Sequence, residues 1–229
     1  MGQQLYINEQ FVSVQGEGIL TGVPSVFVRT SGCNLRCRWC DTPHTSWTPK
    51  GVHQSVDEMV HWIAETGVKH VVLTGGEPLL QPPLAPLCDA LHARGHHITI
   101  ETAGSVYRPV TADLYSISPK LRGSTPDDAV WGPRHDARRL DTAVLSSFVT
   151  HHDVQLKFVV SDAADLTEID ALLAQLPPVA LDRVLVMPEG RTPAELNARA
   201  PMLLDVCIQR GWRFCDRLQI RLFGDVPGT

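Results

Sequence analysis

Three cysteine side chains stand close together in the sequence, at Cys33, Cys37 and Cys40. Their spacing is Cys-x3-Cys-x2-Cys, and the other cysteines of the chain are far away in sequence. Thiolates spaced in this way can wrap one small, soft inorganic centre, such as zinc or an iron-sulfur cluster. On a four-iron cluster, three thiolates would leave one iron open to a substrate or cosubstrate. The cysteine loop, residues 33–40, is therefore the first candidate for a catalytic centre.

A structural zinc site is the alternative for the same cysteines. His44 would complete Cys-x3-Cys-x2-Cys-x3-His, and zinc accepts three sulfurs and one imidazole. Such a site would make the protein a structural or interaction module rather than an enzyme. A second motif, Thr-Gly-Gly-Glu-Pro at residues 74–78, favours the iron-sulfur interpretation. Its glycines let backbone groups approach a ligand, and Glu77 can accept hydrogen bonds from an ammonium group.

The elements that position these motifs alternate between strands and helices. Helices are predicted at residues 55–67, 84–94, 141–149, 166–176 and 193–210. Strands are predicted at residues 6–14, 25–32, 69–74, 97–102, 114–120, 154–160, 183–187 and 213–223. This alternation predicts an α/β fold, a partial, open TIM-like barrel of parallel strands with helices outside. Functional loops of such sheets lie at the carboxyl ends of the strands, where both motifs fall. Residues 121–136, rich in Gly, Pro, Asp and Arg, are predicted to form a mobile surface loop.

Length and composition describe an ordinary globular chain. Its 229 residues suit one domain, residues 1–229, with 43% hydrophobic and 20% charged residues. A net charge of −5 disfavours nucleic acid as a partner, because phosphate-binding surfaces are normally basic. No apolar run is long enough to span a membrane, and no signal peptide is recognisable at the N-terminus. We therefore expect a cytoplasmic protein, whose clustered thiols bind metal rather than form disulfides.

The cysteine loop and the 74–78 motif together resemble the radical S-adenosylmethionine (SAM) superfamily. The resemblance implies a 4Fe-4S cluster on Cys33, Cys37 and Cys40, whose free iron is chelated by the amino and carboxylate groups of SAM. It implies that an electron then cleaves the sulfonium and releases a 5′-deoxyadenosyl radical, which abstracts hydrogen. A flavodoxin- or ferredoxin-type protein would supply the electron. The residues that the resemblance places on the SAM side are Trp39, Cys40, Asp41, Gly75, Gly76, Glu77, Glu101, Ser118, Pro119, Lys120 and Met187.

Further motifs resemble one family within this superfamily, the 7-carboxy-7-deazaguanine synthases. They are Gln15-Gly16-Glu17-Gly18, Arg29, Cys40-Asp41-Thr42, residues 74–78, Ile117-Ser118-Pro119-Lys120 and Leu156-Lys157-Phe158-Val159. Their order along the chain is that of the family. The resemblance implies a homodimeric lyase that contracts the ring of 6-carboxy-5,6,7,8-tetrahydropterin with loss of ammonia, on the route to queuosine and other 7-deazapurines.

Several residues suit a pterin substrate. The carboxylate of Glu17, or backbone carbonyls of residues 14–16, could accept the two adjacent N–H donors of its 2-amino-4-oxopyrimidine edge. Arg29 could form a bidentate pair with the 6-carboxylate. In the family, a hydroxyl at the position of Thr42 binds Mg²⁺, and a hard cation suits oxygen donors. The substrate-side residues are therefore Val14, Gln15, Gly16, Glu17, Arg29, Thr74 and Thr229, with Thr42 for Mg²⁺.

The C-terminal segment, residues 213–229, is predicted to close the substrate site. Gln219 stands at or near the position where many family members carry a histidine, and glutamine can donate a hydrogen bond but not a proton. Val226-Pro227 replaces the usual basic residue of the tail. Two other enzyme activities stay open on these grounds: a radical SAM enzyme acting on another pterin or deazapurine precursor, and a glycyl-radical-activating enzyme.

Overall fold

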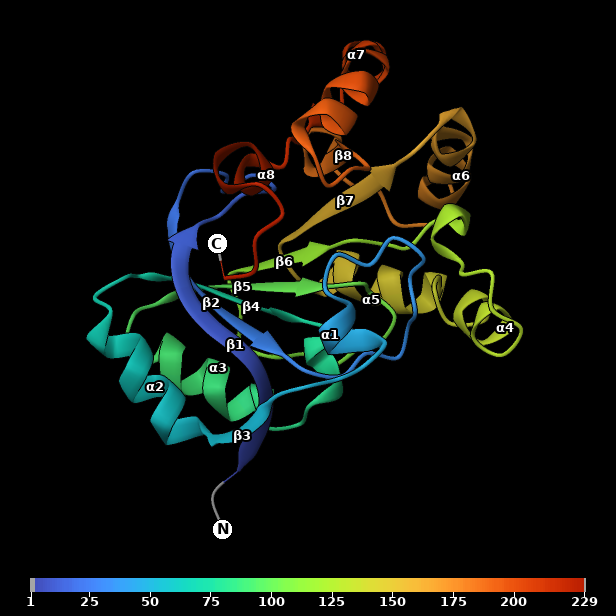
Figure 1. The fold of residues 1–229 in the computed structure, drawn as a ribbon. Coiled ribbons are helices and arrows are strands. Elements are labelled where there is room, and N and C mark those ends of the chain that lie inside the picture. Colours follow the sequence, from blue (N-terminus) through green and yellow to red (C-terminus); the bar gives the residue numbers. More distant parts are fainter. Residues whose placement is uncertain (1–2, 229) are drawn as a thin grey trace.

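The computed structural model describes residues 3–228 and contains one open, mostly parallel sheet (Figure 1). Its strand order is β3-β1-β2-β4-β5-β6-β7-β8-β9. All neighbours from β2 to β9 are parallel, whereas β1 runs antiparallel to β2 and β3. The strands are β1 Gln4–Val14, β2 Pro24–Thr30, β3 Val52–Ser55, β4 His70–Gly75, β5 His97–Thr102, β6 Leu114–Ile117, β7 Val154–Val160, β8 Val184–Pro188 and β9 Arg213–Phe214. The predicted open α/β fold is confirmed.

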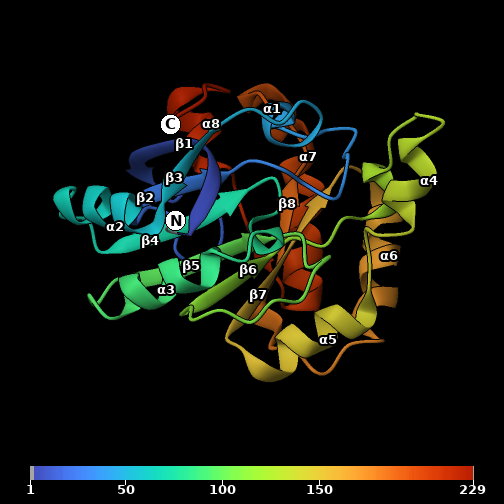
Figure 2. The same ribbon diagram turned by 90° about the horizontal axis from the view of Figure 1, so that it is seen from below.

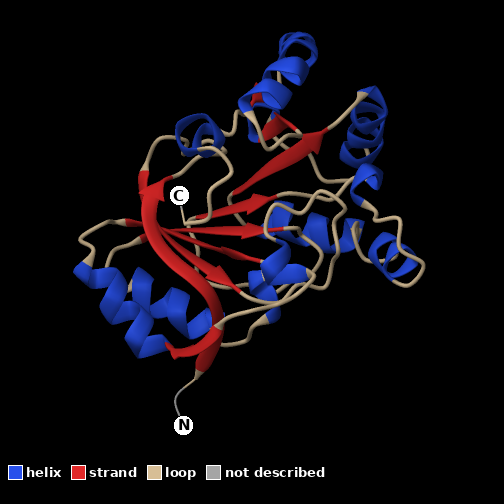
Figure 3. Cartoon of the chain, viewed as in Figure 1, coloured by secondary structure: helices blue, strands red, loops and turns tan. Residues whose placement is uncertain are grey.

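Most of the helices lie on the outer side of the curved sheet, as Figures 2 and 3 show. The helices are α1 Pro43–Ser46, α2 Val56–Glu65, α3 Leu84–His92, α4 Trp131–Asp136, α5 Thr142–His151, α6 Ala163–Leu173, α7 Pro193–Arg210 and α8 Leu218–Phe223. None of them, within residues 3–228, is long and apolar enough to cross a membrane.

Local sequence explains where α2 begins. The Ser55 hydroxyl accepts the backbone N–H of Glu58 at 3.2 Å, and the Glu58 carboxylate accepts that of Ser55 at 2.7 Å. This capping box satisfies two backbone donors that the first helical turn leaves free. The helix then buries Met59, Val60 and Ile63, the face predicted from their spacing.

Strand register brings the two chemical motifs together. Arg29 and Thr30 of β2 pair with Thr74 and Gly75 of β4. The cysteine loop leaves β2 at the same edge of the sheet where the 74–78 motif leaves β4. The buried apolar residues of β4, Val71 to Leu73, are completely inaccessible to solvent and fix this register from within the sheet.

The predicted strand at residues 213–223 is mostly wrong. Only Arg213 and Phe214 pair with the sheet, and Leu218–Phe223 form helix α8. The alternation of Leu218, Ile220 and Leu222 imitates a strand, but only Ile220 is buried, at 3% exposure. Beyond β9 there is no further strand to pair with within residues 3–228, so backbone groups bond locally as a helix.

The segment 121–136, predicted to be a mobile loop, carries regular structure. It contains a 3-10 turn at Arg122–Ser124 and the helix α4. Ser124 and His135 are completely buried. Its polar composition misled the prediction, because these polar side chains are satisfied by one another and by the cysteine loop.

Candidate active site

One cavity at the carboxyl ends of the strands collects most of the predicted site residues. Glu77 and Pro119 do not line it, and Thr229 lies outside the described residues. Those that line it are Val14, Gln15, Gly16, Glu17, Arg29, Cys33, Cys37, Trp39, Cys40, Asp41, Thr42, Thr74, Gly75, Gly76, Glu101, Ser118, Lys120, Met187 and Gln219.

All three cysteines of the loop face this cavity, and none of them forms a disulfide. The backbone N–H of Leu35 points at Cys33 Sγ, 3.3 Å away. Burial raises the pKa of both the Cys33 and the Cys37 thiols to about 12. The thiols therefore carry protons at neutral pH until a metal displaces them. His44 does not line the cavity, so the fourth ligand of the zinc alternative is not gathered with the thiols.

The cysteine loop is supported from outside by His135 of α4. The backbone N–H of Arg36 donates to His135 Nδ1 at 3.0 Å, and His135 Nε2 lies 2.9 Å from the Ser124 hydroxyl. Burial lowers the pKa of His135 to about 4, so the ring is neutral. Because Nδ1 accepts, the proton must sit on Nε2 and point at Ser124. This support came from the segment that the sequence predicted to be mobile.

Gly75 and Gly76 allow the two loops to touch. Gly75 has φ +150°, and a Cβ built on it would overlap the hydroxyl and carbonyl oxygens of Thr30. A Cβ on Gly76 would overlap the carbonyl of Gly32. The backbone N–H of Glu77 donates to that same carbonyl at 2.9 Å. The two glycines are therefore required for contact between the two loops. They also present backbone atoms to the cavity.

Glu77 lies behind the cavity rather than in it. Its carboxylate is completely buried and accepts hydrogen bonds from Thr102 Oγ1 at 2.8 Å, the Ala103 N–H at 2.9 Å and the Leu79 N–H at 3.2 Å. Burial raises its pKa, partly offset by these donors. In this structure Glu77 joins the loops that follow β4 and β5, and its expected contact with SAM is not part of the cavity geometry.

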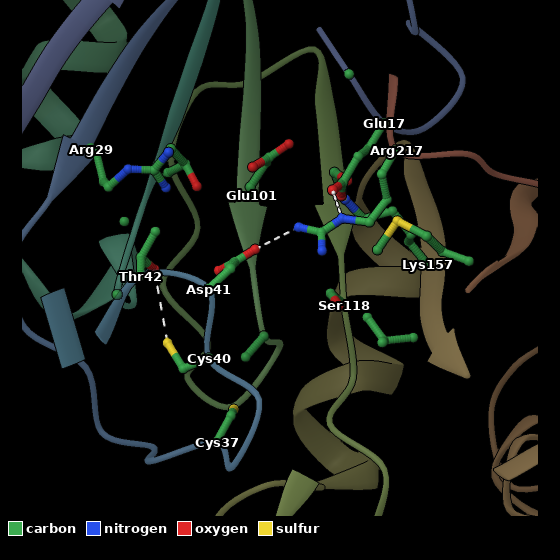
Figure 4. A pocket seen from close by; sticks show the side chains of 18 of the residues that line it. Glu17, Arg29, Cys37, Cys40, Asp41, Thr42, Glu101, Ser118, Lys157 and Arg217 are labelled. Atoms are coloured by element: carbon green, nitrogen blue, oxygen red, sulfur yellow. Dashed lines mark hydrogen bonds and ion pairs between the residues drawn. The ribbon is translucent and has the colours of Figure 1, made fainter. Parts of the chain in front are cut away.

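A buried group of ion pairs forms the opposite wall. Glu17 pairs with Lys157 of β7, accepts from Arg217 Nε at 3.1 Å and from Gln219 Nε2 at 2.8 Å. Burial alone would raise the pKa of Glu17, but Lys157 and Arg217 hold it well below its usual range. Glu17 is thus a carboxylate at neutral pH. Figure 4 shows it beside Arg217 and Lys157.

Arg217 and Lys157 were missed as site residues. A lysine in the apolar strand Val154–Val160 is a usable signal, because a buried ammonium requires a partner. Arg217 had no such signal: it lies within the segment 213–223 that was predicted to be a strand, and its partner Asp41 is 176 positions away.

Arg29 and Glu101 reach the cavity from β2 and β5. Arg29 Nε donates to Glu9 at 2.5 Å, and within residues 3–228 its two Nη groups make no hydrogen bond. Glu101 accepts from Gln15 Nε2 at 3.2 Å. Both side chains are therefore fixed at one end, while polar atoms of each still face the cavity (Figure 4).

Known proteins are similar to this chain in sequence and in fold. The radical SAM superfamily model matches residues 27–118. A 7-carboxy-7-deazaguanine synthase of Rhodopirellula baltica is 50% identical, covering 98% of this chain and 89% of the relative. A protein of the same name from Halobacterium salinarum is 47% identical, covering 100% and 94%. The chain belongs to the 7-carboxy-7-deazaguanine synthase family. The prediction of a radical SAM enzyme is thereby confirmed.

The fold agrees with a solved member of this family. The crystal structure of QueE from Escherichia coli superimposes with a TM-score of 0.74 at 28% identity, covering 94% of both chains. The similarity therefore extends over most of the length of both chains.

The residues present fit the 4Fe-4S cluster and SAM that the radical SAM family implies. The donor set consists of three free thiols, and soft thiolates are the ligands that iron-sulfur clusters use. Leu35, Cys37 and Ala103 form a small apolar cluster here, packed by Cys33, Trp39 and Cys40. Such apolar surroundings limit the access of water to a metal centre. Within residues 3–228 no three His, Cys, Asp or Glu side chains are arranged as a preformed metal site.

Proposed function

We propose that this enzyme converts 6-carboxy-5,6,7,8-tetrahydropterin into 7-carboxy-7-deazaguanine with loss of ammonia. The observation that carries the proposal is one cavity in which the three cysteines face the ionised Glu17 and the guanidinium of Arg29. This arrangement offers a cofactor site and a recognition site for a small anionic heterocycle on opposite walls. The relatives of the same name, similar over nearly their whole length, support it.

Glu17 and Arg29 supply opposite charges that match two ends of the pterin. The anionic Glu17 can accept the N–H donors of the 2-amino-4-oxo edge, together with backbone carbonyls of residues 14–16. The two Nη groups of Arg29 can form a bidentate pair with the 6-carboxylate. Gln219 donates to Glu17 and therefore orients this carboxylate, and we propose no acid or base role for it.

The cofactor wall is formed by the cysteine loop and the carboxyl ends of β4, β5, β6 and β8. When bound, the cluster and SAM would supply the radical that removes hydrogen from the substrate. Cys33, Cys37 and Cys40 would hold the cluster. The SAM-side residues that line the cavity are Trp39, Asp41, Gly75, Gly76, Glu101, Ser118, Lys120 and Met187. Their mixture of backbone, carboxylate and cation suits the zwitterionic end and the ribose of SAM.

We also propose that Thr42 holds Mg²⁺ through its hydroxyl. Thr42 is the N-cap residue of α1, yet its side chain does not cap the helix. The hydroxyl lies 3.9 Å from Cys40 Sγ and accepts from Thr45 Oγ1 at 3.3 Å. An oxygen lone pair on the cavity side would suit a hard cation.

An acidic electron-transfer protein of the flavodoxin or ferredoxin type is the proposed electron donor. Arg38, Arg122 and Arg134 are exposed around the cysteine loop, and the Arg36 guanidinium lies 4.1 Å from the centre of the Trp131 ring. This local positive charge contrasts with the net charge of −5 of the whole chain. Reduction by such a donor should therefore slow as salt concentration rises. The six free cysteines agree with the reducing cytoplasm that we propose as its location.

We propose a homodimer that uses the outer face of α7. Leu204 and Ile208 lie one turn apart on this helix and are 45% and 81% exposed. Light scattering on the purified protein, with Ile208→Lys as the disrupting variant, tests this assignment.

The activity is tested directly with reconstituted protein, SAM, a reductant and 6-carboxytetrahydropterin. We expect 7-carboxy-7-deazaguanine and ammonia as products. SAM cleavage without this product would remove the proposed substrate, and related pterin or deazapurine precursors would then be assayed in its place. A glycyl-radical-activating role would instead require SAM cleavage that depends on a partner protein.

A further inference from the structure

Arg217 is a single side chain that joins three separate segments of the cavity. It lies between β9 and α8 and is only 8% exposed. Its Nε donates to Glu17 at 3.1 Å, its Nη2 to Asp41 at 2.7 Å and its Nη1 to the carbonyl of Gly190 at 2.7 Å. Figure 4 shows the guanidinium between Glu17 and Asp41. All three nitrogens of the guanidinium are thus engaged.

The three segments belong to different parts of the site. Asp41 lies between Cys40 and Thr42, on the cofactor wall. Glu17 follows β1 and stands on the substrate wall, and Gly190 follows β8. A planar guanidinium has a fixed geometry, so its bonds define the distance between these walls.

Asp41 depends on Arg217 more than Glu17 does. The Asp41 side chain is 48% exposed, and within residues 3–228 its carboxylate has no other hydrogen-bond donor. Glu17 keeps Lys157 and Gln219 if Arg217 is removed. Arg191 Nη2 also donates to the Asp41 carbonyl at 3.4 Å. Loss of the Arg217 guanidinium would therefore leave the Asp41 carboxylate without a partner and its loop held less firmly, while Glu17 stays paired and ionised.

We propose that Arg217 is a positioning residue. It sets the distance between the cysteine loop and Glu17, the protein carboxylate proposed to bind the substrate. This inference rests on the proposed function, because it assigns the two walls to SAM and to the pterin. Arg217 itself need not touch either molecule. Without it, the substrate held by Glu17 no longer faces the cofactor wall in a fixed geometry, so SAM cleavage and substrate turnover become uncoupled.

The test compares Arg217→Gln with Arg221→Gln in the reconstituted holoenzyme. Arg221 is a matched control in the same segment: it pairs with Asp216 at 2.9 Å and Asn197 at 2.6 Å and does not line the cavity. We expect Arg217→Gln to raise the KM for the pterin about tenfold, or about 1.4 kcal/mol. We also expect several molecules of SAM cleaved per product molecule, whereas Arg221→Gln should resemble the wild type.

Arg217→Lys separates geometry from charge. Its single ammonium keeps the positive charge but cannot bond all three acceptors in the plane of a guanidinium, so we expect it to show the raised KM and the excess SAM cleavage as well. An unchanged KM and unchanged SAM-to-product ratio in Arg217→Gln would overturn the inference. So would equal effects of Arg217→Gln and Arg221→Gln. If Arg217→Gln does not fold, Arg217→Lys must itself show the raised KM and the uncoupling.

Failure of the proposed function gives a different result. If the wild type makes no product from the pterin, the substrate assignment fails for all variants alike. Backbone hydrogen exchange of residues 38–47 then decides the role of Arg217 without any substrate. Faster exchange there in Arg217→Gln than in Arg221→Gln supports the link through Asp41, and equal exchange overturns it.

Discussion

Replacing Lys157 by methionine should destabilise the protein measurably, because it leaves Glu17 in a buried site with one cation fewer. The side chains of Lys157 and Glu17 are 6% and 14% exposed. Removing one partner of a buried ion pair costs about 3–5 kcal/mol. Arg217 and Gln219 remain on Glu17, so we expect a smaller loss, about 2–3 kcal/mol. For a chain of this length, that corresponds to a fall in Tm of about 4–12 °C.

A double-mutant cycle isolates the pair. Glu17→Gln alone should also destabilise, since it leaves the Lys157 ammonium without its carboxylate. The double variant Glu17→Gln/Lys157→Met removes both charges, so its loss should be smaller than the sum of the single losses by about 2 kcal/mol. Urea unfolding of the metal-free protein at pH 7 measures all four proteins. Lys69→Met, at an exposed lysine directly before β4 and outside the cavity, controls for loss of charge alone.

The pH dependence has a definite sign. The pKa of Glu17 is lowered from its usual 4.5, so its contribution to stability is present above pH 4.5 and is lost as pH falls toward the folded-state pKa. In Lys157→Met the pKa of Glu17 rises, and that contribution shrinks. The difference in the free energy of unfolding between the wild type and Lys157→Met should therefore be greatest at neutral pH and become smaller below pH 4.5. Additive losses in the cycle, or a deficit that grows on acidification, would refute this account of the pair.

Three further changes test the loops around the cavity. Gly75→Ala should destabilise the protein by about 1–3 kcal/mol and prevent cluster assembly, because the added Cβ would overlap Thr30. Tm and the iron content after reconstitution measure the two effects, and normal iron loading would contradict the prediction. Thr42→Ala should abolish the stimulation of product formation by Mg²⁺, whereas Thr42→Ser should retain it. The rate of product formation is measured against Mg²⁺ concentration, and equal responses of Thr42→Ala and the wild type would show that Thr42 is not a ligand. His135→Leu should leave the Arg36 N–H unpaired, cost about 1–3 kcal/mol and speed hydrogen exchange in the cysteine loop, whereas unchanged exchange would show that His135 does not hold the loop.

Local signals in the sequence predicted much of the scaffold. The cysteine loop follows a β-branched strand, and the Gly-Gly-Glu-Pro motif follows another, so parallel pairing of the two strands places both at one edge. The capping box at Ser55 and Glu58 fixed the start of α2 in the same local way. These predictions succeeded because the information lies within a few residues of the feature.

The contacts that hold the site together were not predictable in this way. His135 supports the cysteine loop from 99 positions away, and a buried polar histidine in a Gly- and Pro-rich segment has the same local sequence as an exposed one. The Glu77 carboxylate was expected on the SAM side, and its hydrogen bonds to Thr102 and the Ala103 N–H at the end of β5 left no local signal in the sequence. Which donor meets a carboxylate is decided by tertiary packing.

The ion pairs around Glu17 place two requirements in conflict. A carboxylate that recognises a heterocycle must stay ionised in a buried cavity, and Lys157 and Arg217 provide the positive charge that keeps it so. The same cations occupy oxygen lone pairs that the proposed substrate would need. Gln219 also donates to Glu17 and occupies a lone pair, but it adds no third positive charge, where a protonated histidine would add one. A neutral residue at position 219 is therefore compatible with substrate recognition in a site whose charge is already balanced by two cations.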